Sequence, residues 1–232
     1  MIKRFCQGVA HLRPGAPKYE TTWDPAVVLS YFRQLPAESE LSLLQLSQKL
    51  ATLLALATGQ RQQTLCAIRI DNIVRRGNRL EIEIPKRLKT SKPGKLQPTL
   101  YLPFFVETAI CPARCLLSYL ETTAPLRGSN RSLFVITCAP FGTASPATIA
   151  RWIKETLAAS GVDRRFTAHS TRHAATSAAD RKGLSLAAIQ RAAGWGDSSR
   201  VFASFYNRPL APDPSLFATR MFNSKNLNCA NE

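Results

Sequence analysis

Residues 166–210 hold the feature that most constrains this chain, an ordered set of polar and aromatic side chains. His169 and Arg172 stand three positions apart, so a helix would bring them to one face. Trp195 follows, and then Tyr206, whose phenolic hydroxyl is a candidate nucleophile. An arginine can grip phosphate oxygens while a histidine donates a hydrogen bond, so the set suits chemistry on a phosphate.

This set resembles the tyrosine recombinases, also called the phage integrase family. The order His169-x-x-Arg172, a Gly-Trp pair ending at Trp195, and then Tyr206 carries the resemblance, whereas an H-x-x-R pair alone is common by chance. The segments FTAHSTRHAATSAA, AAGWGDSS and FASFYNRPL are similar to recombinases of eukaryotic Crypton and DIRS-type mobile elements. The resemblance covers residues 23–210 and implies a mainly α-helical catalytic domain with a small antiparallel β-sheet, an α+β fold.

The composition favours a polyanionic partner. The 232 residues carry a formal net charge of +16, the sequence pI is about 10.2, and 45% of the residues are hydrophobic. A ribosomal or merely soluble basic protein would show the same charge, so charge alone does not identify the partner. No run of about 18 apolar residues predicts a membrane span, and the N-terminus is too polar for a signal peptide.

The cysteines do not predict a metal centre. They are scattered along the chain at Cys6, Cys66, Cys111, Cys115, Cys138 and Cys229. Cys111 and Cys115 have a spacing that could ligate zinc, but no second Cys/His pair completes a tetrahedral site. Thiols buried in the core of a protein from a reducing compartment are the better interpretation. The sequence also lacks an acidic cluster suited to Mg²⁺, which argues against a two-metal nuclease or transposase.

Hydrophobic periodicity and capping residues predict most of the elements. Asp24 and Pro25 start a helix, and Gly59 ends a long leucine-rich one. Period-two alternation on either side of a Pro-Gly turn predicts a β-hairpin. The leucine-rich helix spans 39–57 and the hairpin 79–103. The other predicted elements are a helix over 111–123, a strand over 132–137, and helices over 145–161, 169–182 and 185–194, with Tyr206 on a further short helix.

Arg61 follows the turn Thr58-Gly59-Gln60 and opens a predicted short helix, whose N-terminus favours phosphate. Alone, it could equally be a surface charge after a turn. The setting resembles that of the first catalytic arginine of the recombinases. Many relatives carry an acidic residue three positions later, where this chain has Thr64.

The turn of the predicted hairpin is strongly basic, with Lys86, Arg87, Lys89, Lys92 and Lys95. Such a run is usually a solvated loop. The resembling family, however, has its catalytic lysine in this hairpin, where it protonates the leaving 5′ oxygen. Lys89 matches best and Lys92 is the alternative, while Lys86, Arg87, Lys92 and Lys95 are predicted to bind DNA.

Further DNA contacts are implied for the helix over 145–161. In the family the equivalent helix lies against the major groove, which makes Arg151 and Lys154 candidate DNA-binding residues. Trp152 on the same helix is predicted to be a core residue, and His173 a packing residue.

The resemblance implies strand exchange in double-stranded DNA without a metal or other cofactor. Tyr206 would attack a phosphodiester and form a 3′-phosphotyrosine, while Arg61 and Arg172 hold the non-bridging oxygens. His169 and Trp195 would add hydrogen bonds, Trp195 through an indole N–H that can only donate. On sequence alone, Trp195 and Tyr206 could also be buried core aromatics. A homo-oligomer, a tetramer on DNA, is expected, with no membrane partner.

The domain organisation follows from the same resemblance. Residues 1–22 are predicted to be a basic arm or linker, residues 23–210 the catalytic domain, and residues 211–232 a tail of the kind exchanged between protomers. We expect this chain to act without the helical core-binding domain that the family has ahead of the arm, and therefore to show weak site preference. A nuclear location follows if the source is a eukaryotic mobile element, and otherwise a cytoplasmic one with the DNA.

Two other functions stay open. A non-catalytic DNA-binding protein derived from a mobile element would be favoured by loss of a catalytic residue, but every role has a candidate. A type IB topoisomerase would share the chemistry and need no partner protomer. A nicking-and-relaxation assay on monomeric protein separates that activity from recombination.

Overall fold

Helix α3 (Leu43–Thr58) forms the centre of the fold, which a computed structural model describes for residues 18–84, 99–195 and 206–211. The Ser42 side chain accepts from the Gln45 backbone N–H while Gln45 reaches back to Ser42, and this capping box starts the helix. Gly59 ends it at a φ of 60°. Leu46, Leu50, Leu53 and Leu54 are buried, and α3 contacts α5, α6 and α7.

The predicted start of this helix at residue 39 is wrong. Residues Glu38–Glu40 form a separate 3₁₀ turn, η1, and the α-helix begins only after Ser42. The capping box explains the difference, because the Ser42 side chain accepts from the Gln45 N–H and so fixes the first helical turn immediately after Ser42.

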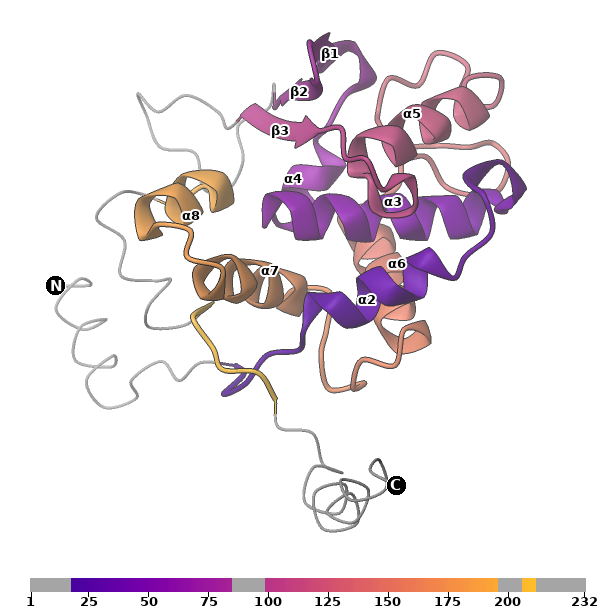
Figure 1. Ribbon diagram of the computed structural model, residues 1–232. Coiled ribbons are helices and arrows are strands. Elements are labelled where there is room, and N and C mark those ends of the chain that lie inside the picture. The colour runs from indigo at the N-terminus through magenta and orange to yellow at the C-terminus, as the bar shows by residue number, and fades with distance from the viewer. Residues whose placement is uncertain (1–17, 85–98, 196–205, 212–232) are drawn as a thin grey trace, which may run out of the picture.

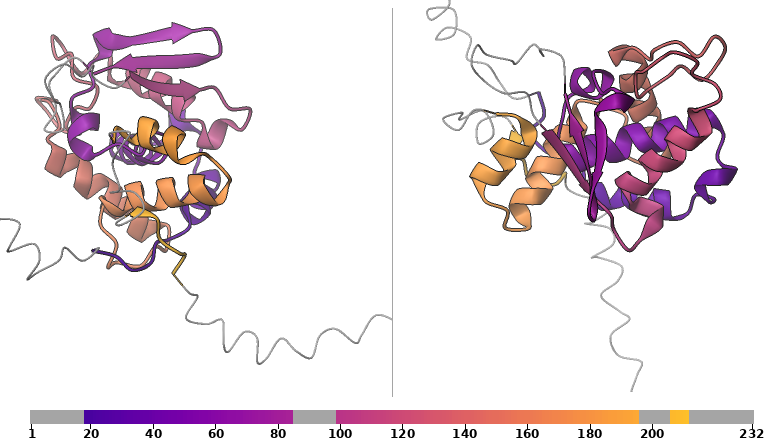
Figure 2. Two further views of the ribbon diagram at one scale, coloured as in Figure 1. Left: turned by 90° about the vertical axis from the view of Figure 1, so that its left-hand side faces the viewer. Right: turned by 90° about the horizontal axis from the view of Figure 1, so that it is seen from above.

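A three-stranded antiparallel sheet covers one side of α3, while α6 and α7 lie on the other side (Figures 1 and 2). The predicted hairpin is present, with Leu80 opposite Leu102 and Ile82 opposite Leu100 on the buried face. The edge strand β1 was not predicted, because most of its residues are exposed and carry no alternating pattern. The strands are β1 Ile73–Arg76, β2 Arg79–Glu83 and β3 Thr99–Pro103.

Three of the remaining helices, α2, α6 and α8, begin at the predicted caps. Asp24, Ser145 and Ser185 each accept a backbone N–H in the first turn, and Gly194 ends the last helix at a φ of 70°. Besides α3, the helices are α2 Pro25–Arg33, α4 Gln62–Cys66, α5 Pro112–Thr123, α6 Pro146–Ala159, α7 Ser170–Arg181 and α8 Leu186–Ala193, with 3₁₀ turns η2 Ile70–Asn72 and η3 Thr108–Ile110.

The strand predicted over 132–137 is wrong, since only isolated bridges occur there, from Arg69 to Ser132 and from Val135 to Thr143. Side chains satisfy part of this buried backbone instead. The Tyr119 hydroxyl accepts from the Val135 N–H at 3.1 Å, and Arg127 donates to the Ser132 carbonyl at 2.7 Å. The apolar run over 132–137 therefore reflects burial of the segment and not pairing in a sheet.

The last described segment returns to the start of the domain. The Thr22 N–H donates to the Pro209 carbonyl at 2.8 Å, and the Ala211 N–H donates to the Thr22 carbonyl at 2.6 Å. The Ser177 hydroxyl of α7 donates to the Tyr206 carbonyl at 2.7 Å. Two distant parts of the chain thus hold Tyr206 beside α7.

The fold is mainly α-helical with a small antiparallel sheet, as the sequence predicts. Trp152 is a buried core residue, 2% exposed. Across residues 18–84, 99–195 and 206–211, each helix falls short of the length and apolar character that a bilayer crossing requires.

Candidate active site

Five of the predicted site residues come from four separate parts of the fold. Arg61 is the N-cap of α4, and His169 is the N-cap of α7. Arg172 lies within α7, while Trp195 follows α8 and Tyr206 opens the last described segment. Helices α7 and α8 lie next to each other in Figures 1 and 2. The fold therefore assembles residues that are distant in the sequence.

A hydrogen bond joins His169 to Tyr206. The His169 Nε2 atom and the Tyr206 hydroxyl oxygen are 3.0 Å apart, and the tautomer of the imidazole decides which one donates. The Tyr206 side chain is 7% exposed. A neutral imidazole with its proton on Nδ1 accepts from the phenol and can take its proton.

Arg172 is a buried cation, and part of its guanidinium is not hydrogen-bonded by the part of the chain that the structure describes. Its side chain is 1% exposed, and Nη1 donates to the Gly59 carbonyl at 2.7 Å. The guanidinium carbon lies 4.1 Å from the centre of a Trp195 ring and 5.4 Å from that of Tyr206. Within the described residues, Nε and Nη2 have no hydrogen-bond partner. Buried donors without partners cost free energy, so this geometry suits an anionic ligand.

The charges around the site are positive. Burial, followed by the nearby Arg61 charge, lowers the pKa of Arg172 to about 9, and Tyr206 opposes this shift. Burial also lowers the pKa of His169 to about 4, with further contributions from Arg172, Arg61 and Lys18. At neutral pH the site thus combines a neutral imidazole with a charged guanidinium.

Arg61 and Trp195 are linked through a residue that the sequence did not single out. Gln60 is 4% exposed, and its Nε2 donates to the Ala192 carbonyl near the end of α8 at 2.7 Å. A Cβ on Gly194 would lie 3.6 Å from the same Gln60 amide. Gln60 therefore ties the turn before Arg61 to the turn before Trp195.

His173 is the second residue whose position was not foreseen. Expected to pack, it does so against Tyr206, with ring centres 4.2 Å apart and planes at 20°. Trp195 meets the Tyr206 ring from another direction, at 4.8 Å and 59°. The spacing of His173 from His169, one helical turn, was the available signal, because it puts both rings on one face of α7.

Two predicted DNA-binding residues border the same site. Arg151 and Lys154 are exposed on α6 and line, with Gln62 and His169, a hollow of about 330 Å³. Its other lining residues are small or polar, Ala150, Thr167 and Ala168. A DNA strand that approached the Tyr206 hydroxyl from this side would pass Arg151 and Lys154.

Other predictions fall on residues 85–98, which lie outside the described residues. They concern Lys86, Arg87, Lys89, Lys92 and Lys95. Phe202 and Phe205 of the predicted helix around Tyr206 also lie outside. Among the residues that the structure does describe, no group of three or more His, Cys, Asp or Glu could hold a metal ion.

The chain belongs to the phage integrase family, the tyrosine recombinases, because the profile of that family matches residues 32–211. No curated protein sequence matches it. Solved structures with the same fold include XerH site-specific recombinase bound to its difH substrate in a pre-cleavage complex (TM-score 0.61, 16% identity, 88% of this chain and 53% of that one). XerA recombinase is also similar, with a TM-score of 0.58 and 19% identity over 93% of this chain and 68% of that one. So is a lambda integrase dimer bound to a COC′ core site, with a TM-score of 0.53 and 20% identity over 88% of this chain and 53% of that one. The chain spans about half the length of the XerH chains.

Acidification is expected to destabilise the folded protein through His169. The pKa of its imidazole is about 4 in the folded chain against an ordinary value of 6.5. Between these values the unfolded chain binds an extra proton, so this stability is fully present above about pH 6.5 and is lost as the pH falls toward 4. One proton gives a slope of up to about 1.4 kcal/mol per pH unit. Urea unfolding of DNA-free protein across this range measures it.

The His169→Gln variant should show a shallower slope over the same range, because an amide does not titrate there. His11→Gln is the matched control, since it removes another imidazole from the chain. An unchanged slope in His169→Gln would contradict the assignment of this pH dependence to His169.

Proposed function

We propose that this chain is an active site-specific recombinase, which cleaves and rejoins DNA strands through a 3′-phosphotyrosine intermediate. The hydrogen bond from Tyr206 to a neutral His169, beside the unused donors of buried Arg172, carries the proposal. The Tyr206 oxygen forms a bond to phosphorus, and its proton passes to Nε2 of His169. The bond from phosphorus to the 5′ oxygen breaks, which leaves a free 5′ hydroxyl. A second 5′ hydroxyl reverses the step on a new partner strand.

The phosphate is held by the two arginines and the indole. Nε and Nη2 of Arg172 donate to non-bridging oxygens, which supplies the partners that they lack without DNA. Arg61 contributes a second cation at the N-cap of α4, and Trp195 contributes an indole N–H. Lys89, with Lys92 as the alternative, protonates the leaving oxygen, a role that stays a prediction outside the described residues.

Duplex DNA is the proposed substrate. The net charge of +16 supports it, as do exposed Arg151 and Lys154 beside His169. Lys86, Arg87, Lys92 and Lys95 are proposed to contact the backbone as well. Among the similar structures, XerH is bound to its difH substrate, and lambda integrase is a tetramer bound to a Holliday junction. A homotetramer on DNA is proposed on this basis.

The source and setting of the reaction are part of the proposal. The segments similar to Crypton and DIRS-type recombinases favour integration or excision of a eukaryotic mobile element, and hence a nuclear reaction. The rival function, DNA binding without catalysis, differs in one measurable respect, because it forms no covalent adduct. Relaxation of supercoiled DNA by the monomer would instead favour topoisomerase activity.

Tyr206→Phe should abolish the covalent protein–DNA adduct on a nicked suicide substrate. The variant keeps the ring that packs against His173 and removes only the attacking oxygen. DNA binding is expected to survive, as measured by fluorescence anisotropy. Tyr101→Phe, at a side chain that is 54% exposed, is the matched control and should form adduct normally. An adduct in Tyr206→Phe would show that another residue is the nucleophile.

Arg172→Lys is expected to slow cleavage on the order of 10²–10³-fold. An ammonium keeps the charge but loses the planar fork that bonds the Gly59 carbonyl and a phosphate together. Single-turnover adduct formation measures the rate, and thermal unfolding checks that the variant folds. Arg165→Lys, on an exposed side chain, is the control. Cleavage at the wild-type rate would count against phosphate contact by Arg172.

His173→Ala should slow adduct formation about 10–100-fold while leaving DNA affinity unchanged, because Tyr206 loses the ring that orients it. His173→Phe should recover most of the rate, since a phenyl ring can stack in the same place. Parallel losses of affinity and rate, without recovery by Phe, would mean that His173 does not act through Tyr206.

A further inference from the structure

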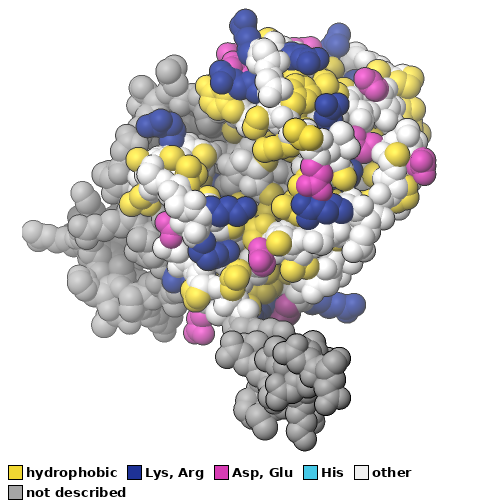
Figure 3. Space-filling model, in the orientation of Figure 1, with side chains coloured by type: hydrophobic (Ala, Val, Ile, Leu, Met, Phe, Trp, Pro, Cys, Tyr) yellow, Lys and Arg dark blue, Asp and Glu magenta, His cyan; other side chains and the backbone are white. Residues whose placement is uncertain are grey.

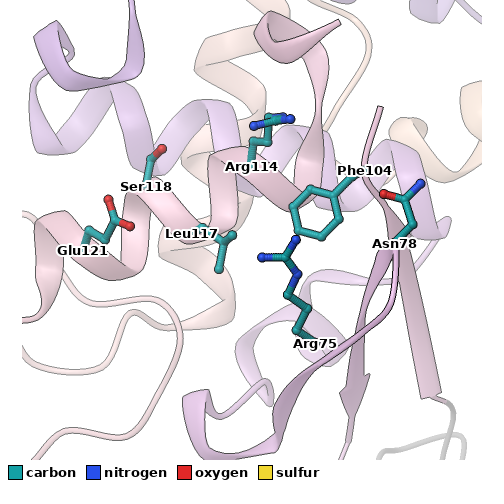
Figure 4. Close-up of a pocket in the computed structure, with 7 residues that line it drawn as sticks. All are labelled: Arg75, Asn78, Phe104, Arg114, Leu117, Ser118 and Glu121. Atoms are coloured by element: carbon teal, nitrogen blue, oxygen red, sulfur yellow. The ribbon is translucent and has the colours of Figure 1, made fainter. Parts of the chain in front are cut away.

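A second hollow lies at the end of the sheet away from the 85–98 segment. The chain enters and leaves that segment at the Glu83–Thr99 end of the hairpin, whereas the hollow lies by the opposite, Arg79–Pro103 end. It measures about 310 Å³ and lies between the β1–β2 turn, the segment after β3, and α5 (Figure 4). The Phe104 N–H donates to the Asn78 carbonyl at 3.1 Å, which fixes one wall.

Two arginines meet over one phenylalanine in this hollow. The guanidinium carbons of Arg75 and Arg114 lie 5.0 and 6.0 Å from the centre of the Phe104 ring. Within the described residues neither arginine makes an ion pair, whereas nearby Arg33 and Arg79 are paired with carboxylates. The ring therefore holds two cations in place while their donors stay available for an anion.

Apolar side chains stand among the polar ones around the two arginines. Phe104 and Leu117 line the hollow, and next in the chain Phe105 is 48% and Val106 100% exposed. Figure 3 shows hydrophobic side chains among Lys and Arg on the upper part of the molecule, over the sheet. Apolar surface rimmed by charge is typical of a protein interaction site.

A carboxylate completes the hollow and argues against DNA as its ligand. Glu121 lies two helical turns beyond Arg114 on α5, at about 10 Å along the axis. It makes no ion pair among the described residues. A nucleic-acid backbone would bring phosphates toward this negative charge, whereas a peptide can offer it an amine, a guanidinium or a backbone N–H.

We propose that this hollow binds a short acidic segment of a partner protein. An Asp or Glu of the segment lies between Arg75 and Arg114, and an adjacent aromatic or aliphatic side chain packs on Phe104 and Leu117. A donor further along the segment faces Glu121. The volume of about 310 Å³ admits a few side chains rather than a folded surface. This proposal does not depend on the proposed strand cleavage, and the two are tested separately.

The test uses a random eight-residue peptide library displayed on phage and panned on the 232-residue chain. Phage that also bind the Arg75→Ala/Arg114→Ala double variant are removed. A synthetic peptide with the consensus sequence is then made, and its affinity for the chain is measured by fluorescence anisotropy. We expect an acidic residue next to an aromatic or aliphatic one. The double variant should bind this peptide about tenfold or more weakly. Arg131→Ala, at another exposed arginine, should bind it normally.

Three results of the peptide experiment would overturn the proposal, and a DNA measurement supplies a fourth. The three are a library with no consensus that depends on Arg75 and Arg114, a basic consensus, and equal peptide affinity in the double variant. Duplex DNA affinity is measured beside the peptide. If the double variant loses as much DNA affinity as Arg151→Ala/Lys154→Ala, the hollow is a DNA contact and not a peptide site. Thermal unfolding confirms that each variant is folded.

Discussion

The buried guanidinium of Arg172 is the constraint around which the candidate site is built. A charge that is 1% exposed needs compensation, and the described part of the chain supplies one carbonyl and two aromatic rings rather than a carboxylate. The carbonyl belongs to Gly59, whose left-handed backbone ends α3. Thus the end of the central helix, the start of α4 and the turn after α8 all meet at one cation. An anion would complete what the protein leaves open.

The position of Tyr206 depends on contacts outside the site. Its backbone carbonyl accepts from Ser177 of α7, and the residues after it pair with Thr22 near the start of the domain. Asn207 also donates to the Asp180 carboxylate at 3.1 Å. Among the described residues, Tyr206 packs in a small hydrophobic cluster with Ile189, separate from the larger core around α3.

The sequence predicts those parts of the fold that depend on local interactions. Caps such as Asp24 and Ser145, the glycine ends of helices, and the period-two hairpin were found because each signal lies within a few residues. The edge strand β1 was missed because most of its residues are exposed and show no period-two alternation. The strand over 132–137 was wrong because burial alone makes a segment apolar, and Tyr119 and Arg127 then satisfy part of its backbone.

The site shows the same division. The spacing of His169 and Arg172 was visible, and so was the order of Trp195 and Tyr206. What the sequence could not show is the hydrogen bond across 37 positions from His169 to Tyr206, or the link across 132 positions from Gln60 to Ala192. Such contacts depend on tertiary packing, and no local pattern encodes them.

The protonation state of His169 depends on the charges around it. The charges that help lower the pKa of His169 are all cations, from Arg172, Arg61 and Lys18. A phosphate among them would supply the opposite charge and raise that pKa again. His169 is thus neutral at pH 7, and in the tautomer with its proton on Nδ1 it accepts the hydrogen bond of Tyr206. A nearby phosphate would make its protonated form more favourable. Burial is the largest cause of the lowered pKa of His169, and the cations add to it. A carboxylate fixed beside Arg172 would satisfy the arginine and offset part of that cationic contribution.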